Sequence, residues 1–273
     1  MISYIKTALF LLLTFSSVNL HAKLLMQGGY SHEFTTTAGG IYKGAIKLKN
    51  MGNTPQEIKL YLEDYLFNAK GESNFTAAHL RKNSRSNSQW IQFSPSHMVL
   101  APNTEKTINY SIKVPQHALT GTYWSTLIVE PLSKTSLESS QKQYNDKKVH
   151  MQISQISRHA VQIITQMGNT GKVNLQLKNP IMNKHKNKRT FSLDAYNSGN
   201  RWIKPKVWLD IHDQKGNFIG KFKGQGSRIY PMTSARFPID ISNLKTGQYK
   251  GLFVIDGGNN NDIMATDINL TIK

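Results

Sequence analysis

The sequence predicts an all-β protein built as two antiparallel β-sandwiches in tandem. Three observations predict this fold. Many segments alternate apolar and polar residues with the period of a half-buried strand. Pairs such as Asn-Gly, Gly-Asn and Lys-Gly, together with Pro, separate these segments every 8–14 residues, and no segment shows convincing helical periodicity. Finally, one order of landmarks occurs twice along the chain.

The two copies of this pattern share five landmarks. In the first copy they are Leu48–Asn53, Ile58–Asp64, Lys70–Glu72, Leu100–Pro102 and Gly121–Tyr123. In the second copy they are Ala195–Asn200, Lys206–Ile211, Lys215–Asn217, Ile229–Pro231 and Gly247–Tyr249. The separation falls from 147 residues at Asn50 and Asn197 to 126 at Gly121 and Gly247, so the first copy is longer, mostly in the polar stretch 69–89.

The strands of each copy are visible in the apolar alternation. Ile58, Leu60 and Leu62 share one face of an expected strand, and residues 107–114 alternate in the same way. Residues 123–129 are more apolar throughout, as expected for a central strand. A copy length of roughly 110–120 residues fits one immunoglobulin-like domain, so we expect two such domains.

The first 22 residues have the layout of a secretory signal peptide. Lys6 supplies the positive charge, residues 8–15 form an apolar run, and a polar stretch leads to Ala22. We therefore expect residues 1–22 to be removed and the protein to be secreted across the inner membrane. No later stretch is long and apolar enough for a transmembrane anchor.

Composition excludes several classes of protein. The 273 residues carry 34 Lys and Arg against 16 Asp and Glu, a formal charge of +18, and no Cys. Without Cys there is no disulfide scaffold, thiol nucleophile or cysteine-based metal site. The charge indicates anionic partners, but secretion argues against nucleic acid.

Catalytic and metal-binding motifs are absent from the sequence. It contains no G-x-S-x-G, no H-E-x-x-H and no phosphate-binding glycine loop, and its nine His residues are scattered. The oxygen-rich run 256–262 lacks the spacing of a calcium loop and is expected to be a hairpin loop. We therefore expect no enzyme activity, no catalytic residues, no cofactor and no metal.

Three basic clusters lie in expected loops, at 81–85, 142–148 and 184–189. They are either solvated loops or a patch for an anionic wall polymer, a membrane surface or an acidic partner. The sequence leaves both interpretations open.

The junction between the domains is expected after a long polar loop at 132–148. Val149, Met151 and Ile153 then alternate, and Val161 and Ile163 resume the pattern. We place the N-terminal domain at 23–156 and the C-terminal domain at 157–273.

The segment from Pro115 to Arg158 resembles the PapD-like periplasmic pilus-assembly chaperones. In that family an aromatic-rich strand ends in a Glu-Ile-Pro-like tail, and a long loop and an alternating apolar strand follow. Here Val129-Glu130-Pro131 ends the strand, and Arg158 stands five residues after Ile153. The family also has a basic residue in its first strand, whereas residues 24–37 contain no Lys or Arg; Lys23 and Lys43 lie nearest.

This resemblance implies a non-catalytic periplasmic chaperone for secreted pilus or surface subunits. Val149, Met151 and Ile153 would form an edge strand that completes a subunit by β-augmentation, and Arg158 would bind the subunit's terminal carboxylate near the inter-domain cleft. An ordinary core strand would show the same alternation.

The repeat also resembles the two-domain extracellular proteins that bind WxL-type cell-wall proteins and peptidoglycan. The alternative function is therefore a structural or adhesive module that binds cell-wall polymer or a cell-surface protein.

Overall fold

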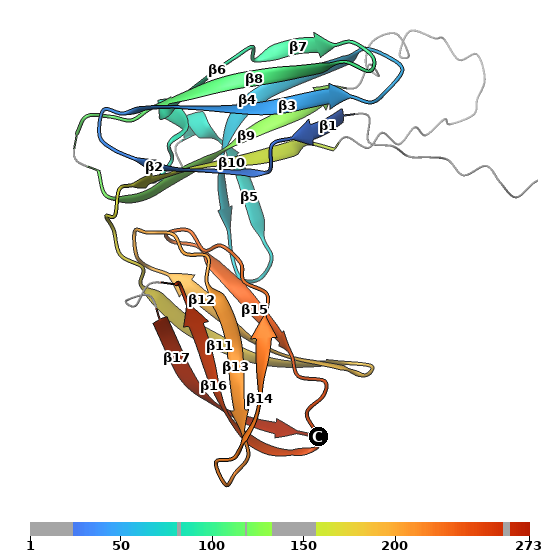
Figure 1. Cartoon of the computed structure of the whole chain (residues 1–273), viewed down its shortest axis with the longest axis vertical. Helices are drawn as coiled ribbons and strands as arrows, with labels where there is room; N and C mark the ends of the chain where they lie inside the picture. The colour runs from blue at the N-terminus through green and yellow to red at the C-terminus, as the bar shows by residue number, and fades with distance from the viewer. Residues whose placement is uncertain (1–23, 81–82, 118, 133–156, 259–262) are drawn as a thin grey trace, which may run out of the picture.

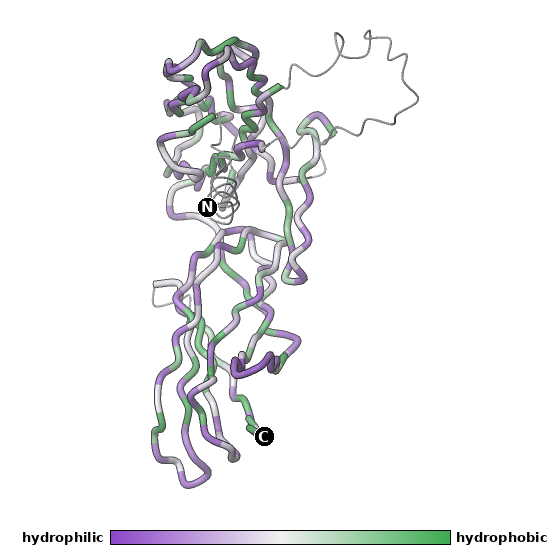
Figure 2. The backbone as a smooth tube through the Cα atoms, turned by 90° about the vertical axis from the view of Figure 1, so that its right-hand side faces the viewer, coloured by the Kyte–Doolittle hydropathy of each residue, from purple (hydrophilic) through white to green (hydrophobic). Residues whose placement is uncertain are grey.

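The computed structural model describes residues 24–80, 83–117, 119–132, 157–258 and 263–273, and it confirms the predicted fold class. In these ranges the regular structure is β-strand, apart from two short 3-10 helices, η1 (Ala78–Leu80) and η2 (Ser88–Trp90). Figure 1 shows two β-sandwiches, with one end of the second lying against the side of the first. Figure 2 shows hydrophilic and hydrophobic residues alternating along many strands. No helix in the described ranges is long and apolar enough to span a bilayer.

The first sandwich consists of two sheets around one hydrophobic core. One sheet has the order β1-β3-β8-β6, and the other has the order β2-β10-β9-β4-β5, with β7 paired to β4. The bounds are β1 Leu24–Gln27, β2 Ser31–Thr36, β3 Ile41–Asn50, β4 Gln56–Phe67, β5 Ser73–Ala77, β6 Ile91–Ser94, β7 His97–Leu100, β8 Glu105–Lys113, β9 Gly121–Leu132 and β10 His159–Met167. The core side chains include Ile46, Leu60, Ile108, Leu127 and Ile163, each at most 2% exposed.

Strand β10 lies in the first sandwich, although we expected residues from 157 onward to belong to the second domain. It pairs antiparallel with β9 from His159 to Met167 and parallel with β2, and its Val161 and Ile163 are fully buried in the first core. The pairing partners of β10 therefore favour a boundary later than 156/157. We propose that the domain junction lies between β10 and the next strand, β11.

The second sandwich is a single seven-stranded sheet that folds over its own core. The order is β11-β12-β15-β14-β13-β16-β17, and β14 and β15 are joined at only one residue pair, Gly224 and Ile239. The bounds are β11 Leu175–His185, β12 Lys188–Asn197, β13 Lys206–His212, β14 Phe218–Gly224, β15 Ser234–Asp240, β16 Gly247–Asp256 and β17 Ile263–Ile272. Strands on both sides of this weak link contribute to the core, for example Phe237 and Phe253.

The internal repeat has the same turn at corresponding positions. Asn50 ends β3 and Asn197 ends β12, and both side chains are fully buried. The Asn50 Oδ1 atom accepts a hydrogen bond from the Gly52 N–H at 2.9 Å, and the Asn197 Oδ1 atom accepts one from the Gly199 N–H at 3.0 Å. The Asn50 amide nitrogen also donates to the Leu100 carbonyl, and that of Asn197 to the Arg201 carbonyl, so one buried Asn closes the turn in each domain.

The two domains touch closely where β9 begins. Gly121 has a φ of +76°, and a Cβ atom at this position would lie 1.9 Å from the Asn200 carbonyl oxygen. The next residue, Thr122, donates its backbone N–H to that same oxygen at 2.8 Å. Glycine is therefore required at position 121, because any larger residue would force the domains apart.

Candidate functional site

The outer face of the sheet formed by β2, β10, β9, β4 and β5 is the surface of the first domain that meets the second. Core-facing residues of β10, such as Val161 and Ile163, have odd numbers, so Gln162 and Ile164 point outward. Ile164 packs in a small separate cluster with Trp124 and Tyr230. This outer face therefore carries the contacts of β10 with the second domain.

Arg158 lies on this face, immediately before β10, and it is exposed. Its Nη1 atom donates to the Tyr61 hydroxyl at 3.1 Å, and that hydroxyl donates to Glu130 Oε2 at 2.8 Å. The hydrogen bond to Tyr61 raises the pKa of the Arg158 guanidinium, and the nearby Glu63 and Glu130 act in the same direction. Arg158, the candidate anchor, therefore already interacts electrostatically with two carboxylates of its own domain.

Arg158 is separated from the contact between the domains. Gln162, four residues later on the same face, contacts Arg228 and Tyr230 of the second domain, and Ile164 follows it in that contact. At about 3.3 Å per residue along an extended chain, the Cα atoms of Arg158 and Gln162 are roughly 13 Å apart. The family resemblance implies that Arg158 lies near the inter-domain cleft. In the structure it is on the same face of the sheet as Gln162, but its hydrogen-bond partner Tyr61 belongs to the first domain.

The cation at the junction comes instead from the second domain. Arg228 forms an ion pair with Glu33 of β2, and its Nη1 atom donates to Gln162 Oε1 at 3.1 Å. Its guanidinium also lies over the Trp202 ring, 4.8 Å from the centroid, and only 15% of its side chain is exposed. Residues 24–37, which contain no Lys or Arg, contribute a carboxylate, Glu33, to this junction. Lys43 does not substitute, because it lies in β3 of the other sheet.

Tyr230 completes the junction from the second domain. It is fully buried, and its hydroxyl donates to Gln162 Oε1 at 2.6 Å. Its ring stacks on Trp124 of β9 with centroids 4.6 Å apart and an interplanar angle of 7°. Burial raises the pKa of the Tyr230 hydroxyl, so the phenol stays neutral and continues to donate.

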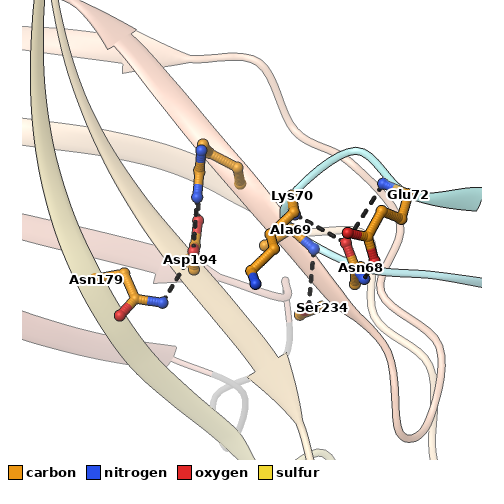
Figure 3. Close-up of polar contacts among 8 residues, drawn as sticks. Asn68, Ala69, Lys70, Glu72, Asn179, Asp194 and Ser234 are labelled. Atoms are coloured by element: carbon orange, nitrogen blue, oxygen red, sulfur yellow. Dashed lines mark hydrogen bonds and ion pairs between the residues drawn. The ribbon is translucent and has the colours of Figure 1, made fainter.

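A hairpin of the first domain also reaches the second. Strands β4 and β5 project toward it in Figure 1, and Phe67 at the end of β4 contacts Tyr230 with ring centroids 5.9 Å apart. Beyond β4, the Ala69 backbone N–H donates to Ser234 Oγ at 2.9 Å (Figure 3). The junction therefore has two supports, the aromatic stack and this hairpin.

A shallow pocket of about 320 Å³ lies beside the junction, lined by both domains. Glu33 and Gln166 line it from the first domain, and Arg201, Trp202 and Lys204 line it from the second. These residues carry no motif that marks a site in the sequence. Among the described residues, no group of acidic and His side chains is arranged to hold a metal ion.

The expected edge-strand residues Val149, Met151 and Ile153 lie outside the described residues, as does most of the loop 132–148. Their role stays a prediction. Of the four predicted binding residues, the structure therefore describes only Arg158.

No protein-family model and no curated protein matches the sequence. Several solved structures are similar to this chain over most of its length. A chaperone–tip adhesin complex of CFA/I fimbriae is 12% identical over 90% of this chain and 98% of that chain, with a TM-score of 0.49. The class 5 fimbriae chaperone CfaA is 14% identical over 89% and 98%, with a TM-score of 0.46. The CsuC–CsuE pre-assembly complex of Acinetobacter baumannii is 13% identical over 89% and 98%, with a TM-score of 0.43. Each of these three structures contains a chaperone of fimbriae or pili.

Proposed function

We propose that this protein is a non-catalytic periplasmic chaperone that binds secreted subunits of pili or other surface structures. The observation that carries the proposal is at the start of β10. The strand pairs with β9 from His159 onward but with β2 only from Gln162 onward, so residues 159–161 have no strand partner on their second side within the described part of the chain. Residues 149–153 precede this strand. The resemblance of the segment from Pro115 to Arg158 to the PapD-like chaperones supports the same role.

The proposed donor residues have odd numbers, as do the β10 residues that face the core. Val161 and Ile163 face the core of the first sandwich. If the alternation of β10 continues toward the N-terminus, Val149, Met151 and Ile153 point to that same side. We propose that this apolar row enters the groove of an incomplete subunit. Main-chain hydrogen bonds supply affinity and the alternate side chains supply specificity.

Arg158 is the proposed contact for a carboxylate of the subunit. A guanidinium has five N–H donors, and in the structure one is assigned to Tyr61. The exposed remaining donors are available to a carboxylate. Because Glu63 and Glu130 lie near, they repel an incoming anion, so we expect Arg158 to contribute less than the apolar row.

The test is a capture experiment from the cell-envelope fraction with the chain 23–273, which contains every described residue. Wild type is compared with Met151→Asp and with the matched control His150→Asp, which places the same charge on the opposite face. Arg158→Ala is compared with Lys113→Ala, a second exposed cation on β8.

The proposal predicts that wild type captures a defined protein, that Met151→Asp loses it and that His150→Asp keeps it. Arg158→Ala should weaken capture more than Lys113→Ala does. If the two aspartate variants behave alike, donation by alternate residues is wrong. If wild type captures no protein but sediments with purified cell wall in a salt-dependent way, the chaperone role is wrong.

A further inference from the structure

The hairpin of β11 and β12 carries the most concentrated positive charge of the described residues. Five of the six residues at its tip, 184–189, are Lys, Arg or His. The turn itself is only two residues long, Lys186 and Asn187, and Figure 1 shows the hairpin extending beyond the neighbouring strands. Residues 184–188 are all exposed. The tip is thus a convex basic projection.

The pairing of the two strands brings like charges together. Lys184 lies directly opposite Arg189, and His185 lies directly opposite Lys188. Such cross-strand pairs are unfavourable in an isolated sheet. Lys186 adds a φ of +53°, a left-handed conformation that is also unfavourable for a residue with a Cβ atom. The stability of the hairpin therefore does not explain why residues 184–189 have this sequence.

Neighbouring acidic residues do not neutralise the tip. None of the ion pairs within the described part of the chain involves residues 184–189. Asp240 interacts electrostatically with Lys188, but its side chain accepts hydrogen bonds from Ser242. The Arg189 main chain is fixed by Ser242 and Ile241, whereas its Nη1 atom is buried without a hydrogen-bond partner.

The rest of the second domain is also positively charged. Residues 172–273 contain 17 Lys and Arg against 7 Asp and no Glu, a formal charge of +10. A strongly negative partner would therefore be attracted to the whole domain and contacted first by its most projecting part. A convex tip of this kind fits an extended anionic surface better than a small ligand, which needs a concave site.

An exposed apolar side chain stands beside the basic tip. Met182 of β11 is 43% exposed, two residues before Lys184. Basic residues flanking an exposed apolar side chain are typical of elements that lie on anionic bilayers, where Lys and Arg meet phosphate groups and the apolar group enters the interface. We propose that the β11–β12 tip binds the surface of an anionic phospholipid bilayer.

The experiment measures cosedimentation of the chain 23–273 with vesicles of phosphatidylcholine alone and of phosphatidylcholine with phosphatidylglycerol. The test variant carries Lys184→Gln, Lys186→Gln, Lys188→Gln and Arg189→Gln. The matched control carries Lys206→Gln, Lys223→Gln, Lys245→Gln and Lys250→Gln, which removes the same charge from exposed positions elsewhere in the second domain. A further arm adds soluble polyglutamate as a competing acidic polypeptide.

We expect wild type to bind only the vesicles that contain phosphatidylglycerol and to be released by salt. Each basic residue near the surface contributes about a fivefold factor, so the tip variant should lose several hundred-fold in partitioning and the control far less. Equal losses in the two variants, or no binding to the anionic vesicles, would overturn the proposal. Tip-dependent binding to polyglutamate without vesicle binding would also overturn it, in favour of an acidic protein partner.

Discussion

Tyr230 of the second domain stacks on Trp124 of the first, with ring centroids 4.6 Å apart and planes inclined by 7°. Both side chains are at most 1% exposed. The stack belongs to neither domain core, since it forms its own cluster with Ile164. It is therefore an apolar contact that both sandwiches share.

Loss of this stack should destabilise the whole chain. We expect Tyr230→Ala to lower the free energy of unfolding by about 3–5 kcal/mol, because it leaves a cavity against Trp124. Tyr230→Phe keeps the ring and loses only the hydrogen bond to Gln162, so it should cost about 1 kcal/mol. Urea unfolding followed by Trp fluorescence measures both. Equal effects of the two variants would show that the ring contact does not stabilise the junction.

The Arg228–Glu33 pair should couple the two domains weakly. Because the Glu33 side chain is 44% exposed, water and salt screen the pair, and a double-mutant cycle with Arg228→Ala and Glu33→Ala should give a coupling of about 1 kcal/mol or less. Arg228→Ala alone should cost more than Glu33→Ala, since it also removes the contact with Trp202. A coupling that does not fall at high salt would contradict this assignment.

Stability should fall in alkali because of two buried tyrosines. Burial raises the pKa of both Tyr110 and Tyr230 above the ordinary value of 10. Their stabilising contribution is therefore complete below pH 10 and is lost as the pH rises toward the folded-state pKa values, because the unfolded chain releases these protons first. The double variant Tyr110→Phe/Tyr230→Phe should show a flatter decline of unfolding free energy above pH 10. An unchanged decline would mean that other groups cause it.

The repeated turn should respond to mutation in the same way in each domain. Asn50→Ala and Asn197→Ala each remove a buried side chain that bonds several main-chain groups, so each should cost about 2 kcal/mol. The costs should add in the double variant, because the sites lie in separate domains. Asn269→Ala, at an exposed position on β17, should change the unfolding free energy by less than about 0.5 kcal/mol. Thermal or urea unfolding tests all four variants.

The strands and the repeat could be predicted because their signals are local. Ile108, Tyr110, Ile112 and Val114 alternate in the sequence, and all four are buried. The position of β10 could not be predicted in this way. Val161 and Ile163 have a pattern that fits either domain, and the choice depends on pairing with β2, about 130 residues earlier.

One feature of the sequence could have indicated the contact between the two domains. Tyr230 occupies the place in the second repeat that exposed Ala101 occupies in the first, so a large aromatic residue stands where its counterpart is small. Its partners Trp124 and Gln162 are distant in sequence, and their contacts arise only from the packing of one folded domain on another.

Hydrogen exchange on the complex with a captured subunit tests the proposed donor strand most directly. We expect the backbone amides within 149–157 to gain protection when the subunit binds, because they would form main-chain hydrogen bonds with it. Protection confined to other surfaces, with 149–157 exchanging at the rate of the free chain, would contradict the account.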